Sequence, residues 1–333
     1  MGAISSLAEE HPYRLLGKDT VGAAIEHFAN WMRSEDSPWF GADTPGQNML
    51  LPSPVGAVRP VFLAHAAQKR GEILPHAAGG APMVVVGVSG LRDFYPLLIA
   101  DNLNRQGYRA RAAFVPWESV ADQRDRNTVQ LADGLEVDAQ LQRLVAALKA
   151  VVQPGERVGL PAILGIDAHA RIVQLLTDAI NAPVFEIPTT PPSVPGIRLY
   201  RSLAHRLEVL GVRIETNMEV IGFHSEGGAL QWIETATASR PLRHSASRYL
   251  LATGGILGGG FAGGEDGIVR EQVFGLPLSV PVGRENWFRP RFFDEAGQPV
   301  FFGGVRIDDR LQPVNEVGEV IYANLWAAGG VLA

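Results

Sequence analysis

Met83-Val-Val-Val-Gly-Val88 is a continuous apolar run of the kind that forms a strand covered on both faces. It is followed by Ser89-Gly90, by a helix-like stretch at about 93–106 and by a second strand pattern, YRARAAFV, at 108–115. These residues predict one strand-helix-strand unit, which is the building block of α/β proteins.

The neighbouring segments extend this pattern. Apolar residues at three- and four-residue spacing predict helices within 141–152 and 172–180, and VFEI at 184–187 predicts another strand. On the N-terminal side, residues 20–34 have the periodicity of an amphipathic helix. The proline- and glycine-rich stretch 38–60 forbids a long helix and predicts short strands and turns. Alternating helices and short apolar strands favour an α/β layer with substantial parallel sheet.

The C-terminal part is richer in strand patterns. Leucines line one side of a predicted helix at 199–210, and VRIETNMEVIGF at 212–223 predicts a strand. ALQWIETAT at 229–237, which follows two glycines, predicts the second arm of a hairpin. GQPVFFGGVRIDDRLQPV at 297–314 predicts a β-rich excursion.

Composition excludes several classes of protein. Hydrophobic residues make up 46% of the 333 residues and charged residues 19%, which is enough apolar surface for a sizeable core. A formal charge of −6 gives no reason to expect nucleic acid. Without cysteine the chain provides no disulfide, thiolate nucleophile or iron–sulfur ligand, so any such cluster must lie on a partner. No signal peptide and no apolar run near the about 18 residues of a membrane span are found, so we expect a cytoplasmic protein.

Two strand-to-glycine junctions are the most informative local motifs: YLLATGG at 249–255 and LWAAGG at 325–330. In a doubly wound sheet, ligands bind outside the carboxyl ends of strands, where glycines let the backbone approach a nucleotide. The candidate cofactor-binding residues are therefore Thr253, Gly254, Gly255, Ala328, Gly329 and Gly330. A buried strand that turns tightly explains either motif equally well.

A further glycine pattern is less convincing. Gly258, Gly260 and Gly263 have the spacing of a dinucleotide fingerprint, but no amphipathic helix follows and no acidic residue stands about 20 residues on in a strand. We interpret this segment as a glycine loop. A nicotinamide-dependent dehydrogenase that uses it is a weaker alternative.

Polar candidates are few. The histidines lack metal-ligand spacing, so no metal site is predicted, and His169 is expected at a helix start or on the surface. Ser89 and Arg92, after the first strand, and Ser193 and Arg198, around the turn-rich PPSVPGI segment, are candidates for contacts to substrate or between lobes. Structural ion pairs explain the arginines equally well.

A set of motifs in one order identifies a resemblance. They are HPYRLL at 11–16, VVVGVSGLRDF at 84–94, IPTTPPSVPGIRL at 187–199, YLLATGGILGGG at 249–260, FGGVRIDDRLQPV at 302–314 and NLWAAGGVLA at 324–333. Together they resemble the B subunit of anaerobic glycerol-3-phosphate dehydrogenase, and the two junctions are similar to those of fumarate-reductase-like flavoproteins.

The resemblance implies a flavin-containing subunit of a complex that oxidises sn-glycerol 3-phosphate to dihydroxyacetone phosphate and passes electrons towards quinone. It implies FMN, with FAD as the flavin of the fold relatives. It also implies two partners: a catalytic flavoprotein subunit, and an iron–sulfur subunit that docks the complex to the cytoplasmic face of the inner membrane. A non-catalytic subunit that only bridges these partners is the alternative.

The resemblance also implies a domain organisation. Residues 1–195 are expected to form a cap or substrate-type α/β lobe with a Pro/Gly-rich N-terminal part, inserted into a doubly wound, mainly parallel flavin-binding sheet. Residues 196–333 are expected to be the remainder of the flavin-binding domain, with a β-rich excursion at about 265–318. Family members begin with a strand and glycine-rich loop and continue past AAGG into a helix. We therefore expect this flavin-binding sheet to be incomplete, with its first βαβ unit missing.

Overall fold

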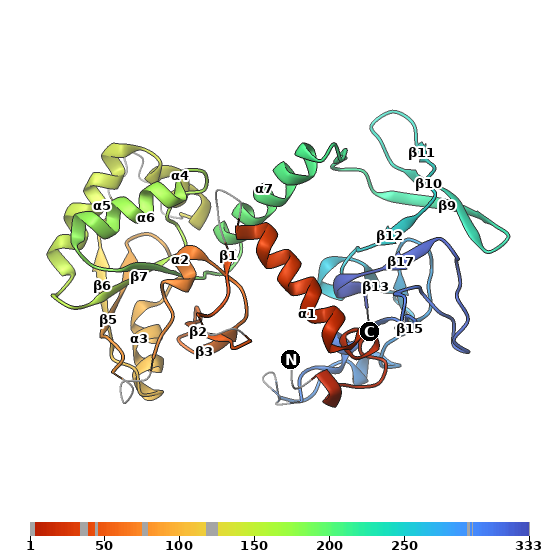
Figure 1. Ribbon diagram of the computed structural model, residues 1–333, viewed down its shortest axis with the longest axis horizontal. Helices are drawn as coiled ribbons and strands as arrows, with labels where there is room; N and C mark the ends of the chain where they lie inside the picture. The colour runs from red at the N-terminus through yellow and green to blue at the C-terminus, as the bar shows by residue number, and fades with distance from the viewer. Residues whose placement is uncertain are drawn as a thin grey trace. The chain divides into compact units, whose positions relative to one another are not determined.

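The computed structural model describes residues 4–33, 39–43, 46–74, 79–117, 126–291, 294 and 296–332. The chain forms two compact units (Figure 1). Unit 1 combines Met1–Ala24 with Glu215–Ala333, and unit 2 is Ile25–Ile214. Unit 2 is therefore inserted into unit 1 in the sequence. Among the described residues, no helix is both long and apolar enough to span a membrane.

Unit 2 contains the parallel sheet that the sequence predicts. Its strands, in the spatial order β6-β5-β7-β8, are Ala110–Val115, Met83–Val88, Arg157–Pro161 and Val184–Ile187. All three neighbouring pairs are parallel. The helices between them are α3 (Pro96–Arg105), α4 (Thr128–Leu135), α5 (Asp138–Val151) and α6 (His169–Ile180).

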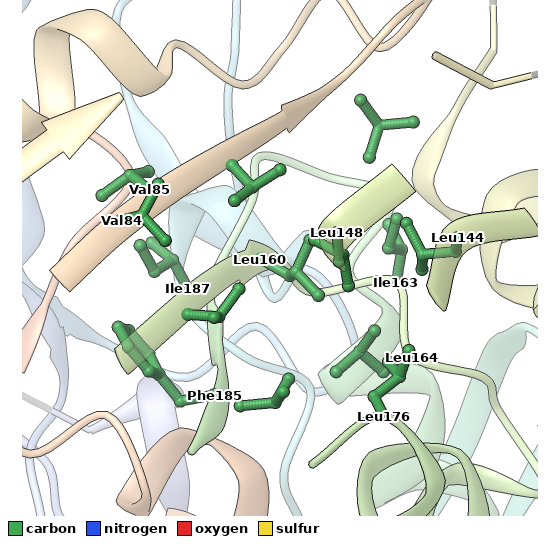
Figure 2. Packing of buried hydrophobic residues seen from close by; sticks show 14 of the residues in the cluster. Val84, Val85, Leu144, Leu148, Leu160, Ile163, Leu164, Leu176, Phe185 and Ile187 are labelled. Atoms are coloured by element: carbon green, nitrogen blue, oxygen red, sulfur yellow. The ribbon is translucent and has the colours of Figure 1, made fainter. Parts of the chain in front are cut away.

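The core of unit 2 lies between this sheet and its helices. Every residue of β5 is buried, as expected for a strand covered on both faces. Figure 2 shows part of this packing, with side chains from β5, β7, β8, α5 and α6: Val84, Val85, Leu160, Phe185, Ile187, Leu144, Leu148 and Leu176. The core thus joins residues that are far apart in the sequence.

The Pro/Gly-rich stretch forms the short strands that the sequence predicts. They are β1 (Trp39–Phe40), β2 (Met49–Pro52), β3 (Val58–Val61) and β4 (Ala64–His65), followed by the short helix α2 (Ala66–Lys69). Strands β2 and β3 form one antiparallel pair, and β1 and β4 form another.

Two longer helices lie near the division between the units. Helix α1 (Pro12–Arg33) includes residues 20–33 of the predicted helix, whose residue 34 lies outside the described residues. It begins earlier than predicted and bends at Gly17, whose φ is 76°. Helix α7 (Val194–Val209) belongs to unit 2. The division by contacts thus falls after Ile214 and assigns residues 1–24 to unit 1, which differs from the boundary at 195 expected from the sequence.

Unit 1 is built mainly from short antiparallel strands. The predicted hairpin is present, with β9 (Val220–Glu226) and β10 (Ala229–Thr235) joined at Gly227 and Gly228, both at positive φ, and β11 (Leu242–His244) pairs with β10. Residues 212–219, which were included in the predicted strand, are not in it.

The expected β-rich excursion contains three short strands within 265–318. They are β14 (Val269–Glu271), β15 (Leu278–Ser279) and β16 (Gly304–Val305), interspersed with the 3-10 turns Arg284–Asn286 and Pro299–Phe302. Strand β13 (Phe261–Gly263) pairs with β14, and β15 pairs with β16. The named strands that the structure describes in unit 1 include one parallel pair, β12 (Tyr249–Leu251) with β17 (Leu325–Ala327). Most of the predicted parallel sheet therefore lies in unit 2.

Candidate functional site

The two strand-to-glycine junctions lie side by side in unit 1. Leu251 of β12 is in register with Ala327 of β17, and the N–H of Ala328 donates to the carbonyl of Leu251 at 2.9 Å. Because the strands are parallel, both carboxyl ends point to the same edge. The structure thus brings together the two halves of the predicted cofactor site, Thr253–Gly255 and Ala328–Gly330.

Glycine is required where the two junctions approach each other. A Cβ atom added to Gly255 would lie 2.6 Å from the carbonyl oxygen of Gly330, a distance that real side chains do not adopt. Gly254 and Gly329 have φ angles of 83° and 78°, which glycine adopts without the steric cost that a side chain brings. The glycines therefore hold two backbone segments closer than side chains would permit.

Backbone donors at this edge remain available. No hydrogen bond from the N–H groups of Thr253, Gly254, Gly329 and Gly330 is found within the described parts of the chain. Thr253, Gly329 and Gly330 are exposed. Unpaired N–H groups at the carboxyl ends of adjacent parallel strands suit the phosphate or ring oxygens of a nucleotide cofactor. The residues present therefore fit a flavin.

The glycine loop that follows does not form a dinucleotide fingerprint. Gly258 ends a 3-10 turn, Ile256–Gly258, and the N–H of Gly260 donates to the carbonyl of Gly255 at 3.1 Å. Gly263 is the last residue of strand β13. A fingerprint requires a helix there, so that helix N–H groups meet the pyrophosphate. The interpretation of this segment as a loop is confirmed.

In unit 2, three of the four polar candidates follow the carboxyl ends of strands of the parallel sheet. Ser89 follows β5, and both its N–H and its hydroxyl donate to the carbonyl of Val115, at 3.0 and 3.1 Å. Ser193 follows β8 and caps α7, where its hydroxyl accepts from the N–H of Gly196 at 3.2 Å. Arg92 is exposed. Thus Ser89, Arg92 and Ser193 share one edge.

Arg198 lies in a different environment from the expected lobe interface. It is 2% exposed, and its guanidinium donates to both carboxylate oxygens of Glu186, at 2.7 and 2.9 Å, and to the carbonyl of Gly165. The side chain therefore ties α7 to β8 and to the loop after β7. Because its donors are used inside unit 2, Arg198 positions other segments rather than contacting a ligand.

Sequence reasoning missed a buried cluster around this ion pair. The rings of His65 and His169 lie 4.5 Å apart, and Nδ1 of His169 is 2.8 Å from the carbonyl of Leu164. Glu186 also accepts from the N–H of Leu164 at 2.9 Å. His65, His169 and Glu186 come from β4, α6 and β8, so no spacing in the sequence reveals that they meet.

The ligand atoms of His65, His169 and Glu186 lie within 4.8 Å of one another, a separation that raises the question of a metal ion. Both oxygens of Glu186 already accept from Arg198. The pKa of His65 is lowered to about 3, mainly by burial and next by His169, although Glu186 raises it. The same desolvation and the same guanidinium disfavour a divalent cation, so we assign no metal here, and the sequence-based expectation of no metal site stays a prediction.

A second carboxylate fills the anion position at the start of α6. An oxygen of Glu136 accepts from the N–H groups of residues 166, 167 and 168, at 2.7, 2.8 and 3.2 Å. This is where a helix N-terminus in an α/β sheet would otherwise bind a phosphate. The N–H groups of the loop after β7 therefore already have an acceptor within the protein, the carboxylate of Glu136.

Comparison with known proteins agrees with this architecture. Residues 1–333 match the model of the FAD binding domain family, which defines the chain as a flavoprotein of that class. A Halobacterium salinarum strain R1 protein, named as a probable B subunit of anaerobic glycerol-3-phosphate dehydrogenase, is 32% identical over 99% of this chain and 77% of its own length. The B subunit of the same enzyme from Glaesserella parasuis serovar 5 is 31% identical over 97% of this chain and 76% of its own.

The Aliivibrio fischeri B subunit is 27% identical over 100% of this chain and 77% of its own. No solved structure matches the chain. The chain belongs to the family of anaerobic glycerol-3-phosphate dehydrogenase B subunits, and the resemblance noted in its motifs is confirmed.

Proposed function

We propose that the chain is the flavin-binding B subunit of a complex that oxidises sn-glycerol 3-phosphate to dihydroxyacetone phosphate. One observation carries the proposal: the two glycine junctions, which are far apart in the sequence, meet at one edge with unpaired N–H groups. The family match supports flavin at this edge. Of the two flavins expected, FAD is the one that the matched family's description names.

The reaction turns a secondary alcohol into a ketone, so the substrate gives up two electrons and two protons. A bound flavin supplies the two-electron acceptor. The backbone N–H groups of Thr253, Gly254, Gly329 and Gly330 would bind and orient this flavin by hydrogen bonds, and Gly255 would keep the two junctions in contact. The electrons then leave towards quinone through partner subunits.

The partners that we propose are a catalytic flavoprotein subunit and an iron–sulfur subunit. The naming of the relatives as B subunits supports a complex of several different chains. This chain has no cysteine, so cysteine ligands for an iron–sulfur cluster must come from another subunit. We place the complex at the cytoplasmic face of the membrane, attached through that iron–sulfur subunit.

A second candidate function is a bridging subunit without its own chemistry. The six residues of the two junctions, Thr253–Gly255 and Ala328–Gly330, carry no titratable side chain. Such a site binds a cofactor through its backbone but offers no acid or base for proton transfer from the alcohol. A flavin here would then relay electrons from the catalytic partner.

The decisive experiment is Gly255→Val in the full complex, with Gly222→Val as a matched control in the same unit. A side chain at Gly255 collides with the backbone of Gly330, whereas one at Gly222 meets its nearest neighbour, Glu234, only at 4.0 Å. We expect the Gly255 variant to assemble but to lose the visible absorbance of bound flavin and most of its turnover. Unchanged flavin content in that variant would refute the flavin site. Lost flavin with unchanged turnover would instead support a bridging role in which the flavin of this chain carries no electrons.

For the substrate, we propose the carboxyl edge of the sheet in unit 2, where Ser89, Arg92 and Ser193 lie. Arg198 acts there as a positioning residue, since it holds the loop after β7 and the start of α7 in place.

A further inference from the structure

We infer that unit 2 binds a phosphate monoester at the carboxyl end of β5, between the backbone N–H of Gly90 and the guanidinium of Arg126. The inference rests on the proposed function, because it assigns the phosphate group of the substrate to a place in this chain. It concerns unit 2 alone and is independent of whether flavin binds at the glycine junctions of unit 1.

The sheet topology selects this edge. In the spatial order β6-β5-β7-β8, the chain leaves β5 towards one side of the sheet and leaves β7 towards the other. The order therefore reverses between β5 and β7, which is the topological switch point. Open parallel sheets bind their ligands outside the carboxyl ends of the strands at that point, and sheets with this flavodoxin-like order follow the same rule.

Of the two loops at the switch point, only the one after β5 offers free donors among the described residues. After β7, the N–H groups of residues 164 and 166–168 already donate to Glu186 and Glu136. An anion there would have to displace a carboxylate of the protein. After β5, the N–H groups of Ser89 and Leu91 bond to backbone carbonyls, but none of the described residues accepts from the N–H of Gly90.

A guanidinium lies beside this unpaired N–H group. Arg126 pairs through its backbone with Leu91, and a Cβ atom added to Gly90 would lie 3.7 Å from its Cδ and 3.8 Å from its Nη1. Nη1 also donates to the carbonyl of Trp117 at 2.9 Å, which fixes the side chain and leaves other N–H donors of the guanidinium. The residue that carries the main-chain donor and the cation therefore lie next to each other.

The charges of the loop favour an anion. Of the described residues 89–93 and 126, Arg92 and Arg126 carry two positive charges and Asp93 carries one negative charge, and Ser89, Gly90, Arg92 and Asp93 are exposed. A guanidinium binds phosphate oxygens through two parallel hydrogen bonds, and a neighbouring backbone N–H completes the recognition of a dianion. The glycerol hydroxyl groups are not needed for this contact, so the phosphate is the recognised group.

The experiment measures binding of sn-glycerol 3-phosphate to the full chain by titration calorimetry, with flavin present and again with flavin removed. Arg126→Gln should weaken binding by about tenfold or more, because a hydrogen bond to a charged group is lost. Arg126→Lys, which keeps the charge but not the planar fork, should weaken it less. Arg105→Gln is the matched control, since Arg105 lies on the surface of α3 at the end far from this edge and pairs with Asp101.

Inorganic phosphate should compete with glycerol 3-phosphate in the wild-type chain, whereas glycerol should not bind. Equal dissociation constants for the wild type, the folded Gln variant and the Lys variant would overturn the inference, as would binding of glycerol without its phosphate. Flavin binding and turnover with an unchanged KM in the Arg126 variants would also overturn it while leaving the proposed function intact. Absence of bound flavin together with retained phosphate binding would refute the proposed flavin site and leave the inferred phosphate site intact.

Discussion

The buried histidine pair predicts that unit 2 loses stability in mild acid. His65 is 1% exposed and faces His169 from α6, Glu186 from β8, Arg198 from α7 and the uncharged ring of Trp39 from β1. The pKa of His65 is lowered from 6.5 to about 3, first by burial and then by the nearby His169, while Glu186 raises it and Arg198 lowers it. The pKa of His169 is lowered as well, first by burial.

The sign follows from proton binding. Below pH 6.5, His65 binds a proton in the unfolded chain, whereas in the folded chain it binds one only near pH 3. Lowering the pH from 6.5 to 3 therefore favours unfolding. Each pH unit within it costs about 1.4 kcal/mol. Between pH 6.5 and pH 5, His65 alone therefore removes about 2 kcal/mol of folding free energy, and His169 adds to this loss in the same direction.

The assay is urea denaturation of the full chain at pH 7 and pH 5, with hydrogen exchange of the α2 and α6 amides to report on unit 2 alone. His65→Phe keeps the ring contacts to Trp39 and His169 but removes the titration, so it should lose about 2 kcal/mol less than the wild type on acidification. His205→Gln, at an exposed position of α7, is the control and should lose as much as the wild type. Equal losses in the wild type and the Phe variant, or a His65 ring resonance that titrates near pH 6.5, would refute the reasoning.

Other predictions concern the buried carboxylates. Arg198→Met should cost about 3–5 kcal/mol in urea denaturation because Glu186 is left buried without its partner, and adding Glu186→Leu should restore most of the loss; an uncorrected double variant would contradict the ion-pair account. Glu136→Ala should raise hydrogen exchange in the first turn of α6 and cost about 1–2 kcal/mol, unless water replaces the carboxylate fully. Although burial raises the pKa of Glu156, its bonds to Arg111 lower it overall, so Arg111→Met should remove stability at pH 7 and little below pH 4; equal effects at both pH values would rule this out.

The sequence predicts the parts of the fold whose signal is local. The all-buried β5 is recognisable from six apolar residues, and the β9–β10 hairpin from two glycines between alternating strands. Strand β7 is missed because Arg157, Gly159 and Pro161 interrupt its apolar pattern. Gly159 is explained only by the tertiary structure: a Cβ atom there would lie 2.8 Å from the ring of Phe185 on the neighbouring strand. A contact between residues on two different strands produces no periodic pattern in the sequence.

The candidate sites also differ in whether their signal in the sequence is local. The junctions of unit 1 are found from the sequence because a strand followed by glycines is a local motif, although their pairing across β12 and β17 comes only from the fold. The sequence leaves two roles open for Arg198, a contact to substrate or between lobes and a structural ion pair, because its partner Glu186 lies on another element; the structure shows the ion pair. Strands β5, β6 and β7 lie between His65 and His169 in the chain, so the contact of the two rings is beyond any spacing rule.

What separates a binding loop from a structural loop in this protein is where the N–H groups at the strand ends find acceptors. After β7, the carboxylates of Glu136 and Glu186 take up the donors, and the loop is closed by the protein itself. After β5 and after β12 no carboxylate of the described residues takes this place, and the N–H groups of Gly90 and Gly254 donate to none of the described residues. Water can satisfy an exposed N–H group at little cost, whereas a buried N–H group needs an acceptor within the protein. Folding is therefore compatible with both kinds of loop, and the open N–H groups after β5 and β12 are the places where we propose that anionic ligands bind.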